Sequence, residues 1–150
     1  MPHLSLFSPV GDLTLIEEEG ALVALEWGRA PEGAGSKLLM EAKRQLDAYF
    51  AKQLSAFDLP LRMIGTAFQK RVWARMTKIP YGETVSYGMV ARELESGPRA
   101  VGTACGRNPI PIIVPCHRIL ATNGIGGFSG GTGLETKRAL LRLEGAGYLF

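Results

Sequence analysis

The stretch SYGMVARELESGPRAVGTACGRNP, residues 86–109, predicts two short helices joined by a tight turn. Ser86 is a favourable N-cap for the first helix, because its hydroxyl can accept a hydrogen bond from an unpaired backbone N–H. The tripeptide SGP forms the turn, and Pro98 suits the first turn of the second helix. The first helix has its apolar residues on one face: Tyr87, Val90, Ala91 and Leu94. This is the outline of a helix-turn-helix, a motif typical of DNA-binding proteins.

The second of these helices, RAVGTACG, is built almost entirely from small residues. Small side chains at Ala100 and Gly102 would let the helix backbone approach a surface closely, and Arg99 would project from the helix start. Tight packing within the protein explains the small residues equally well. The charge distribution favours DNA: residues 1–65 hold six Lys and Arg against nine Asp and Glu, whereas residues 66–150 hold eleven against five. A positive half is expected of a protein that binds a polyanion.

The composition is typical of a globular protein, with 46% hydrophobic and 21% charged residues in a chain of 150. This length fits one ordinary domain or two small lobes. No apolar run approaches the ~18 residues that span a membrane, and the start of the chain lacks the features of a signal peptide. We therefore expect a cytoplasmic protein. With two cysteines and two histidines, the chain has neither a disulfide framework nor the spacing of a zinc site, so we expect no metal and no cofactor.

The first part of the chain predicts a small antiparallel sheet followed by one helix. The three expected strands are HLSLFS (3–8), DLTLIEEE (12–19) and ALVALEWG (21–28). A helical pattern covers residues 36–53, and FDLPLRMIG (57–65) predicts an extended linker. We therefore expect an α/β protein with a scaffold lobe over residues 1–62, which contains no chemical motif, and a mostly α-helical lobe over residues 63–150.

The stretch IPIIVPCHRIL, residues 110–120, places a cysteine beside a histidine within an apolar run. The apolar residues before the cysteine predict a short buried strand. Buried cysteines are more often inert than reactive. A thiol becomes a nucleophile when a base lies within hydrogen-bond reach and a third group orients that base. His117 is the only histidine near Cys116 in the sequence, and either Glu144 or Glu83 could orient its ring.

These motifs together resemble those of the O6-alkylguanine-DNA alkyltransferases, or methylated-DNA–protein-cysteine methyltransferases. The similarity covers residues 65–145 through the ordered motifs GTAFQ, VW, IPYGETVSY, PRAVG, NP, VPCHRI, SGG and LEG. It implies a ribonuclease-H-like first lobe ahead of a mostly α-helical lobe that contains the helix-turn-helix. It also implies DNA repair by direct transfer of an alkyl group from O6 of guanine in double-stranded DNA to the protein. The base would be flipped out of the duplex, and each protein molecule would react once.

The resemblance also implies roles for individual residues. Cys116 would accept the alkyl group, His117 would act as its base through a water, and Glu144 would hold the imidazole in the required tautomer. Asn108 would brace the two halves of the active lobe.

The same resemblance places the DNA in contact with the second lobe through the minor groove, which is ~6 Å wide and favours a helix of small residues. Tyr87 would contact the flipped nucleotide, and Arg99 would fill its vacated place. The expected DNA-binding residues are Tyr87, Arg99, Ala100, Gly102 and Arg107. The expected pocket residues are Pro111, Ile119, Phe128 and Ser129.

Two other classes of protein stay open at this point. A non-catalytic sensor, like the alkyltransferase-like proteins, would bind alkylated bases, but those proteins typically have tryptophan in place of Cys116. An unrelated Cys-His hydrolase would leave Arg99 and the small-residue helix unexplained. Two departures from the family pattern fall at the expected pocket: the loop 122–131 is one residue shorter than usual, and Phe128 replaces the usual Tyr. We expect a monomer. The preferred alkyl group, and whether O4-alkylthymine is also repaired, stay open.

Overall fold

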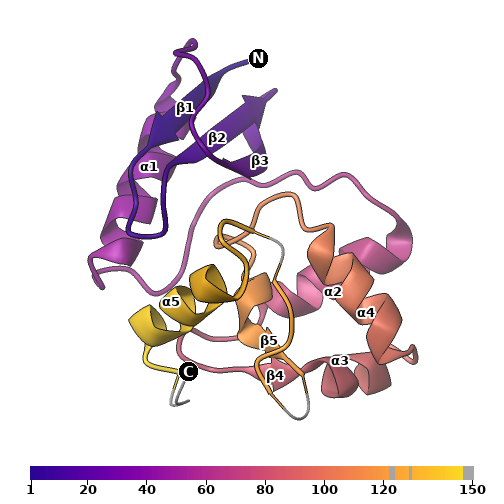
Figure 1. Ribbon diagram of the computed structural model, residues 1–150. Helices are drawn as coiled ribbons and strands as arrows, with labels where there is room; N and C mark the ends of the chain where they lie inside the picture. Colours follow the sequence, from indigo (N-terminus) through magenta and orange to yellow (C-terminus); the bar gives the residue numbers. More distant parts are fainter. Residues whose placement is uncertain (122–123, 129, 147–150) are drawn as a thin grey trace. The chain divides into compact units, whose positions relative to one another are not determined.

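The computed structural model describes residues 1–121, 124–128 and 130–146. The chain divides into two compact units, Met1–Ile64 and Gly65–Phe150 (Figure 1). No helix in the described part of the chain is both long and apolar enough to cross a membrane.

The first unit is a three-stranded antiparallel sheet with one helix packed on it (Figure 1). Its elements are β1 (His3–Leu6), β2 (Leu13–Glu18), β3 (Ala21–Trp27) and α1 (Lys37–Phe50), with the strands in the order β1-β2-β3. Helix α1 begins after Ser36, whose hydroxyl accepts a hydrogen bond from the N–H of Leu39 at 3.0 Å. The core contains mainly leucines from both layers: Leu6, Leu13, Leu15, Leu22, Leu25, Leu39 and Leu46. The sheet-plus-helix prediction for this unit is confirmed.

The predicted linker between the units also contributes to this sheet. The N–H of Leu22 donates to the carbonyl of Pro60 at 2.9 Å, and the N–H of Arg62 donates to the carbonyl of Leu22 at 2.9 Å. These two hydrogen bonds form a parallel bridge between Leu22 and Leu61. The end of the first unit is therefore anchored to β3.

The second unit is mostly helical (Figure 1). In chain order its elements are α2 (Ala67–Thr77), β4 (Val85–Ser86), α3 (Tyr87–Glu93), α4 (Pro98–Gly106), the 3₁₀ turn η1 (Cys116–Arg118), β5 (Ile119–Leu120) and α5 (Leu134–Glu144). Strands β4 and β5 pair in parallel, with Val85 opposite Ile119 and Ser86 opposite Leu120. This short pairing joins the start of α3 to the segment that follows Cys116.

Helices α3 and α4 form the predicted helix-turn-helix and pack against each other and, in the case of α4, against α2. The hydroxyl of Ser86 caps α3 by accepting from the N–H of Met89 at 3.0 Å, and Pro98 occupies the first turn of α4. The indole Nε1–H of Trp73 in α2 donates to the carbonyl of Ala104 in α4 at 2.9 Å. Ala104 and Cys105 of α4 are buried, so small residues serve packing on one side of the helix.

The structure corrects one prediction: residues 110–115 are buried but form a turn instead of a strand. The N–H of Val114 donates to the carbonyl of Ile110 at 2.9 Å, so the segment pairs with itself. Ile112 has φ of 72°, in the left-handed region that β-branched residues rarely adopt. Pro111 has no N–H to donate to a neighbouring strand, which favours a closed turn over a sheet.

Helix α2 begins with a capping box, which gives a test of local stability. The hydroxyl of Thr66 accepts from the N–H of Gln69 at 3.1 Å, and the Gln69 side chain accepts from the N–H of Thr66 at 2.9 Å. We expect Thr66→Ala to lower the free energy of unfolding by about 1 kcal/mol in urea denaturation, because it leaves the backbone N–H of Gln69 unpaired. Thr77→Ala, which removes only a hydroxyl bonded to the carbonyl of Trp73 within the same helix, is the control and should change it by less than about 0.5 kcal/mol.

Candidate active site

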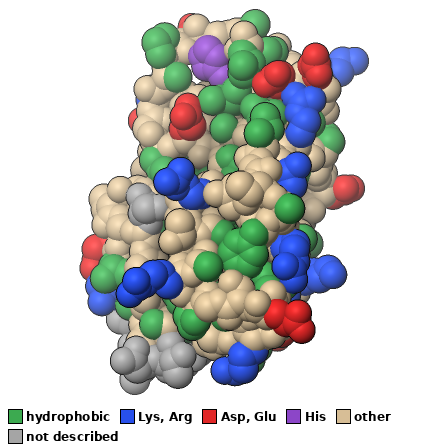
Figure 2. Space-filling view, turned by 90° about the vertical axis from the view of Figure 1, so that its right-hand side faces the viewer, with side chains coloured by type: hydrophobic (Ala, Val, Ile, Leu, Met, Phe, Trp, Pro, Cys, Tyr) green, Lys and Arg blue, Asp and Glu red, His purple; other side chains and the backbone are tan. Residues whose placement is uncertain are grey.

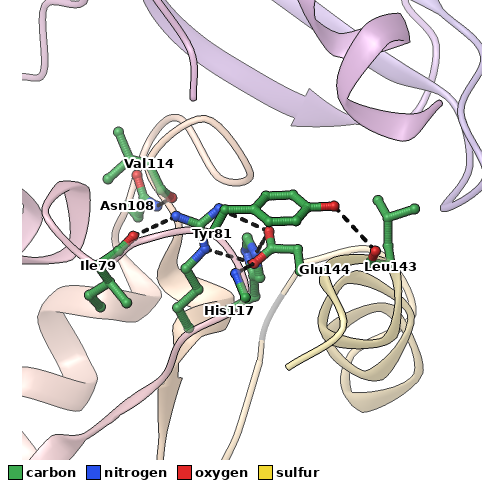
Figure 3. A network of polar contacts seen from close by, with 9 residues as sticks. Ile79, Tyr81, Asn108, Val114, His117, Leu143 and Glu144 are labelled. Atoms are coloured by element: carbon green, nitrogen blue, oxygen red, sulfur yellow. Dashed lines mark hydrogen bonds and ion pairs between the residues drawn. The ribbon is translucent and has the colours of Figure 1, made fainter. Parts of the chain in front are cut away.

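Cys116 opens the 3₁₀ turn η1 and is buried, with only 8% of its surface exposed. Asn108 closes the turn that precedes it. The Nδ2–H of Asn108 donates to the carbonyl of Val114 at 2.8 Å (Figure 3). Its Oδ1 accepts from the N–H of Ile110 at 3.0 Å. One side chain thus pairs with backbone groups at both ends of the turn and fixes the path of the chain into Cys116.

Glu144, near the end of α5, holds the two residues that follow Cys116. Its Oε2 accepts from Nε2 of His117 at 2.7 Å (Figure 3). The guanidinium of Arg118 donates to both carboxylate oxygens, from Nε at 2.8 Å and from Nη2 at 3.0 Å. His117, Arg118 and Glu144 are 0%, 6% and 5% exposed. Of the two glutamates that could orient His117, the structure selects Glu144, and Glu83 lies at the surface.

The segment between α2 and β4 completes this polar network. The Nη1–H of Arg118 donates to the carbonyl of Ile79 at 2.6 Å, and the N–H of Gly82 donates to Oε1 of Glu144 at 3.3 Å. The hydroxyl of Tyr81 donates to the carbonyl of Leu143 at 3.2 Å (Figure 3). The residues of the IPYGE motif therefore hold the end of α5 in place.

The arrangement fixes the tautomer of His117. A carboxylate paired with Arg118 can only accept, so the imidazole hydrogen is on Nε2 and Nδ1 has a lone pair. Burial lowers the pKa of His117, and Arg118 lowers it further, while Glu144 raises it in part. Nδ1 is buried and has no hydrogen-bond partner among the described residues. The ring is thus a neutral base with its accepting atom available.

The thiol of Cys116 is protonated at rest. Burial raises its pKa, an effect that Asn108 and the ammonium of Lys137 partly oppose. Tyr87 and Cys105 lie near Cys116: burial and, to a smaller extent, the charge of Cys116 raise the pKa of both side chains to about 12. The Sγ of Cys105 contacts Sδ of Met76 at 3.6 Å, which is a packing contact. A thiol in this environment needs a base to become a nucleophile.

Two buried cations of this region were not identified from the sequence. Arg118 follows the Cys-His pair directly, and its burial could not be inferred from adjacency. Lys137 lies seven residues before Glu144, on the same face of α5 as the buried Leu140 and Leu141. This position within the apolar pattern was the available signal, because a lysine on the apolar face of a helix is buried together with that face.

The expected DNA-binding residues lie on the helix-turn-helix. On α4, Arg99 and Ala100 are exposed and Gly102 is partly exposed, and Arg107 lies exposed just after the helix. A Cβ at Gly102 would have no heavy atom within 4 Å, so the helix surface is open there. Tyr87 is half-buried at the start of α3. Figure 2 shows one face of the molecule, on which Lys and Arg side chains are interspersed with uncharged surface and with some Asp and Glu side chains.

Of the expected pocket residues, Pro111 and Ile119 are buried and Phe128 is half-buried. Ser129 lies outside the described residues, as does part of the short loop 122–131. The structure brings Asn108, Cys116, His117 and Glu144 together directly, with Tyr87 nearby. Arg99 is exposed at the start of α4.

Together, the fold and the site define a protein of two units in which a buried Cys–His–Glu arrangement accompanies a helix-turn-helix. Residues 5–63 match the family model of the ribonuclease-like domain of 6-O-methylguanine DNA methyltransferase, and residues 67–146 match that of its DNA binding domain. The chain therefore belongs to the 6-O-methylguanine DNA methyltransferase family.

Individual relatives agree with this assignment. The methylated-DNA–protein-cysteine methyltransferase of Methanosarcina acetivorans is 41% identical over 93% of this chain and 95% of its own. The Mycobacterium tuberculosis protein of the same name is 44% identical over 95% of this chain and 91% of its own. The crystal structure of M. tuberculosis OGT in complex with DNA superposes with a TM-score of 0.88, at 42% identity over 97% of this chain and 94% of that one.

The neutral state of His117 gives a pH dependence that can be measured. Because burial lowers the pKa of His117 in the folded protein, the unfolded chain binds a proton first as the pH falls below about 6.5. The free energy of unfolding should therefore decrease between pH 7 and 5.5, with a slope that approaches about 1.4 kcal/mol per pH unit. Urea denaturation at several pH values measures this slope. His117→Asn should flatten it, whereas His3→Asn should leave it intact. An equal slope in His117→Asn would show that the lowered pKa of His117 does not cause the pH dependence.

Proposed function

We propose that this protein repairs DNA by moving an alkyl group from O6 of guanine to Sγ of Cys116, in one reaction per protein molecule. Membership of the family supports the reaction class. The observation that carries the proposal is the pairing of a buried thiol with a neutral imidazole whose Nε2 is held by Glu144 and whose Nδ1 is available. This is the arrangement needed to activate a cysteine.

In the proposed reaction, His117 takes the thiol proton through a bridging water, and Sγ attacks the alkyl carbon. The Sγ–C bond forms as the O6–C bond breaks, and the electron pair of that bond stays on the guanine. The guanine then takes up a proton and returns to its ordinary form. Glu144 and Arg118 hold the imidazole while its charge changes, because Glu144 accepts from both residues.

The product explains why each molecule would react only once. An S-alkylcysteine is a thioether, which neither water nor a second thiol can cleave, since thiol exchange acts on disulfides. The protein is therefore consumed in the reaction, and one lesion is repaired per molecule.

The target atom lies inside a base stack, so the base must leave the duplex, at a cost of a few kcal/mol. In our proposal α4 binds the minor groove, where Ala100 and Gly102 allow close approach and Arg107 contacts the phosphates. Arg99 enters the duplex and replaces the flipped base, and Tyr87 contacts the flipped nucleotide. The exposed positions of Arg99 and Ala100 and the open surface at Gly102 support this binding mode.

The flipped base would enter a pocket formed by Pro111, Ile119, Phe128 and Ser129. The presence of Cys116 favours alkyl transfer over a sensor that only binds the lesion. A hydrolase would leave the exposed Arg99 without a role. Action as a monomer and a cytoplasmic location stay predictions from the sequence, and repair of O4-alkylthymine stays an open question.

The reaction itself can be tested by intact-protein mass spectrometry after incubation with a duplex that contains one O6-methylguanine. We expect the mass to increase by one methyl group per protein, mapped to Cys116. Cys116→Ala should show no increase, and Cys105→Ala, which removes the other buried thiol, should behave like the wild type. Tight binding of the lesion without a mass change would show that the protein is a sensor.

Base flipping gives a second test, with Arg99→Ala. Loss of the residue that replaces the flipped base should slow transfer from duplex DNA by roughly tenfold or more, which corresponds to about 1.4 kcal/mol. Transfer from a free O6-alkylguanine base should be unchanged, because no base has to be flipped. Arg92→Ala, at an exposed arginine of α3, is the matched control. Equal losses on duplex and free base would contradict this role of Arg99.

A further inference from the structure

Lys137 in α5 is a buried cation that the proposed mechanism does not use. It is 0% exposed, although lysines are almost never fully buried without partners. Its Nζ donates to the carbonyl of Ile119 at 2.7 Å and to the carbonyl of Gly127 at 3.1 Å. It also lies 5.8 Å from the centre of the Tyr87 ring. The ammonium thus contacts three separate segments of the chain.

Two of these segments adjoin the candidate active site. Ile119 directly follows the turn that contains Cys116 and His117, and Tyr87 begins α3. Gly127 belongs to the glycine-rich loop and precedes Phe128. A hydrogen-bonded Lys137 therefore ties the loop to the segment that carries the thiol.

The loop approaches Tyr87 very closely at Gly126. This residue has φ of 76°, and a Cβ there would lie 3.1 Å from Cε2 of Tyr87 and 3.5 Å from Nζ of Lys137. Both the backbone conformation and the lack of space favour glycine. The position of the loop relative to Tyr87 and Lys137 is thus sterically defined.

The ammonium also acts on the thiol. Lys137 lowers the pKa of Cys116, against the stronger effect of burial. In return, Cys116 and Cys105 raise the pKa of Lys137, which burial lowers to about 8. The other titratable groups that face this cluster are Tyr87 on α3 and His117, and Arg118 is paired with Glu144.

We propose that Lys137 is a positioning residue for alkyl transfer: it holds the carbonyls of Ile119 and Gly127, which fixes the pocket between them, and its buried charge stabilises the thiolate of Cys116. This inference rests on the proposed function. It assigns to one side chain both the shape of the pocket and part of the activation of the thiol.

Three variants test it. Lys137→Met removes the charge and both hydrogen bonds at similar volume, and Lys137→Gln keeps a donor but removes the charge. Lys43→Met, at a surface lysine of α1 whose side chain is 40% exposed, is the control. The single-turnover rate of methyl transfer is measured at saturating lesion duplex from pH 6 to 9, together with the affinity for undamaged duplex.

We expect Lys137→Met to lower the rate at pH 7 by roughly tenfold, as for a rise of one unit in the pKa of the thiol. The midpoint of its pH profile should move to higher pH, while the affinity for undamaged DNA changes by less than about twofold, well below the tenfold expected for the rate. Lys137→Gln should show the same shift of the midpoint. Unchanged rates and midpoints in both variants, with only a lower melting temperature, would overturn the proposal. Absence of transfer in the wild type would instead overturn the proposed function, and the role of Lys137 with it.

A measurement by NMR covers the case in which the Lys137 variants do not fold. The side-chain Cε resonance of Lys137 is titrated in the wild type and in Cys116→Ala. Because the charge of the Cys116 thiolate raises the pKa of Lys137, the titration midpoint should be lower in Cys116→Ala when the titration extends to the pH at which Cys116 ionises. An identical midpoint in the two proteins would show that the ammonium and the thiol do not interact, and would overturn the proposal.

Discussion

The second unit depends on the hydrogen bonds and the ion pair that the buried carboxylate of Glu144 forms. It accepts from His117, from two nitrogens of Arg118 and from the backbone of Gly82. A buried carboxylate without partners would be strongly unfavourable, and Arg118 neutralises it with a cation that cannot lose its proton. Since Arg118 balances the charge, His117 can stay neutral and still have its ring oriented. Arg118 therefore forms the ion pair with Glu144, while the neighbouring His117 is the base that Glu144 orients.

The turn before Cys116 is the second constraint, and it replaces regular secondary structure. The side chain of Asn108 pairs with backbone groups of Ile110 and Val114, so the buried polar atoms of the turn are satisfied without a sheet. Ile112 has a left-handed conformation within this turn. Such a conformation is unfavourable for a β-branched residue and persists only where the surroundings enforce it. The buried neighbours of Ile112 and the two hydrogen bonds of Asn108 enforce this conformation directly before Cys116.

Much of this architecture follows from the sequence, because caps and turns have local causes. The roles of Ser86 and Pro98 at the helix starts depend on their own chemistry, and the structure confirms both. The turn at 110–115 was predicted as a strand because β-branched residues favour strands, whereas the pairing of its backbone depends on Asn108. The burial of Lys137 does not follow from its own helix alone, because its Nζ donates to carbonyls of two other segments. Sequence patterns thus identify residues with local functions better than residues that connect distant segments.

The charges around Cys116 suit a thiol that is used once. In the resting protein, burial keeps the thiol protonated and His117 neutral, so the nucleophile is weak between encounters with DNA. Thiolates are the form that oxidants attack, and a protonated, buried thiol is protected from that loss. For the proposed single reaction, such protection matters more than speed, because an oxidised molecule cannot be used again. The available Nδ1 of His117 and the nearby ammonium of Lys137 supply activation from within the site. Protection and reactivity can therefore coexist, because both depend on groups that are buried together with the thiol.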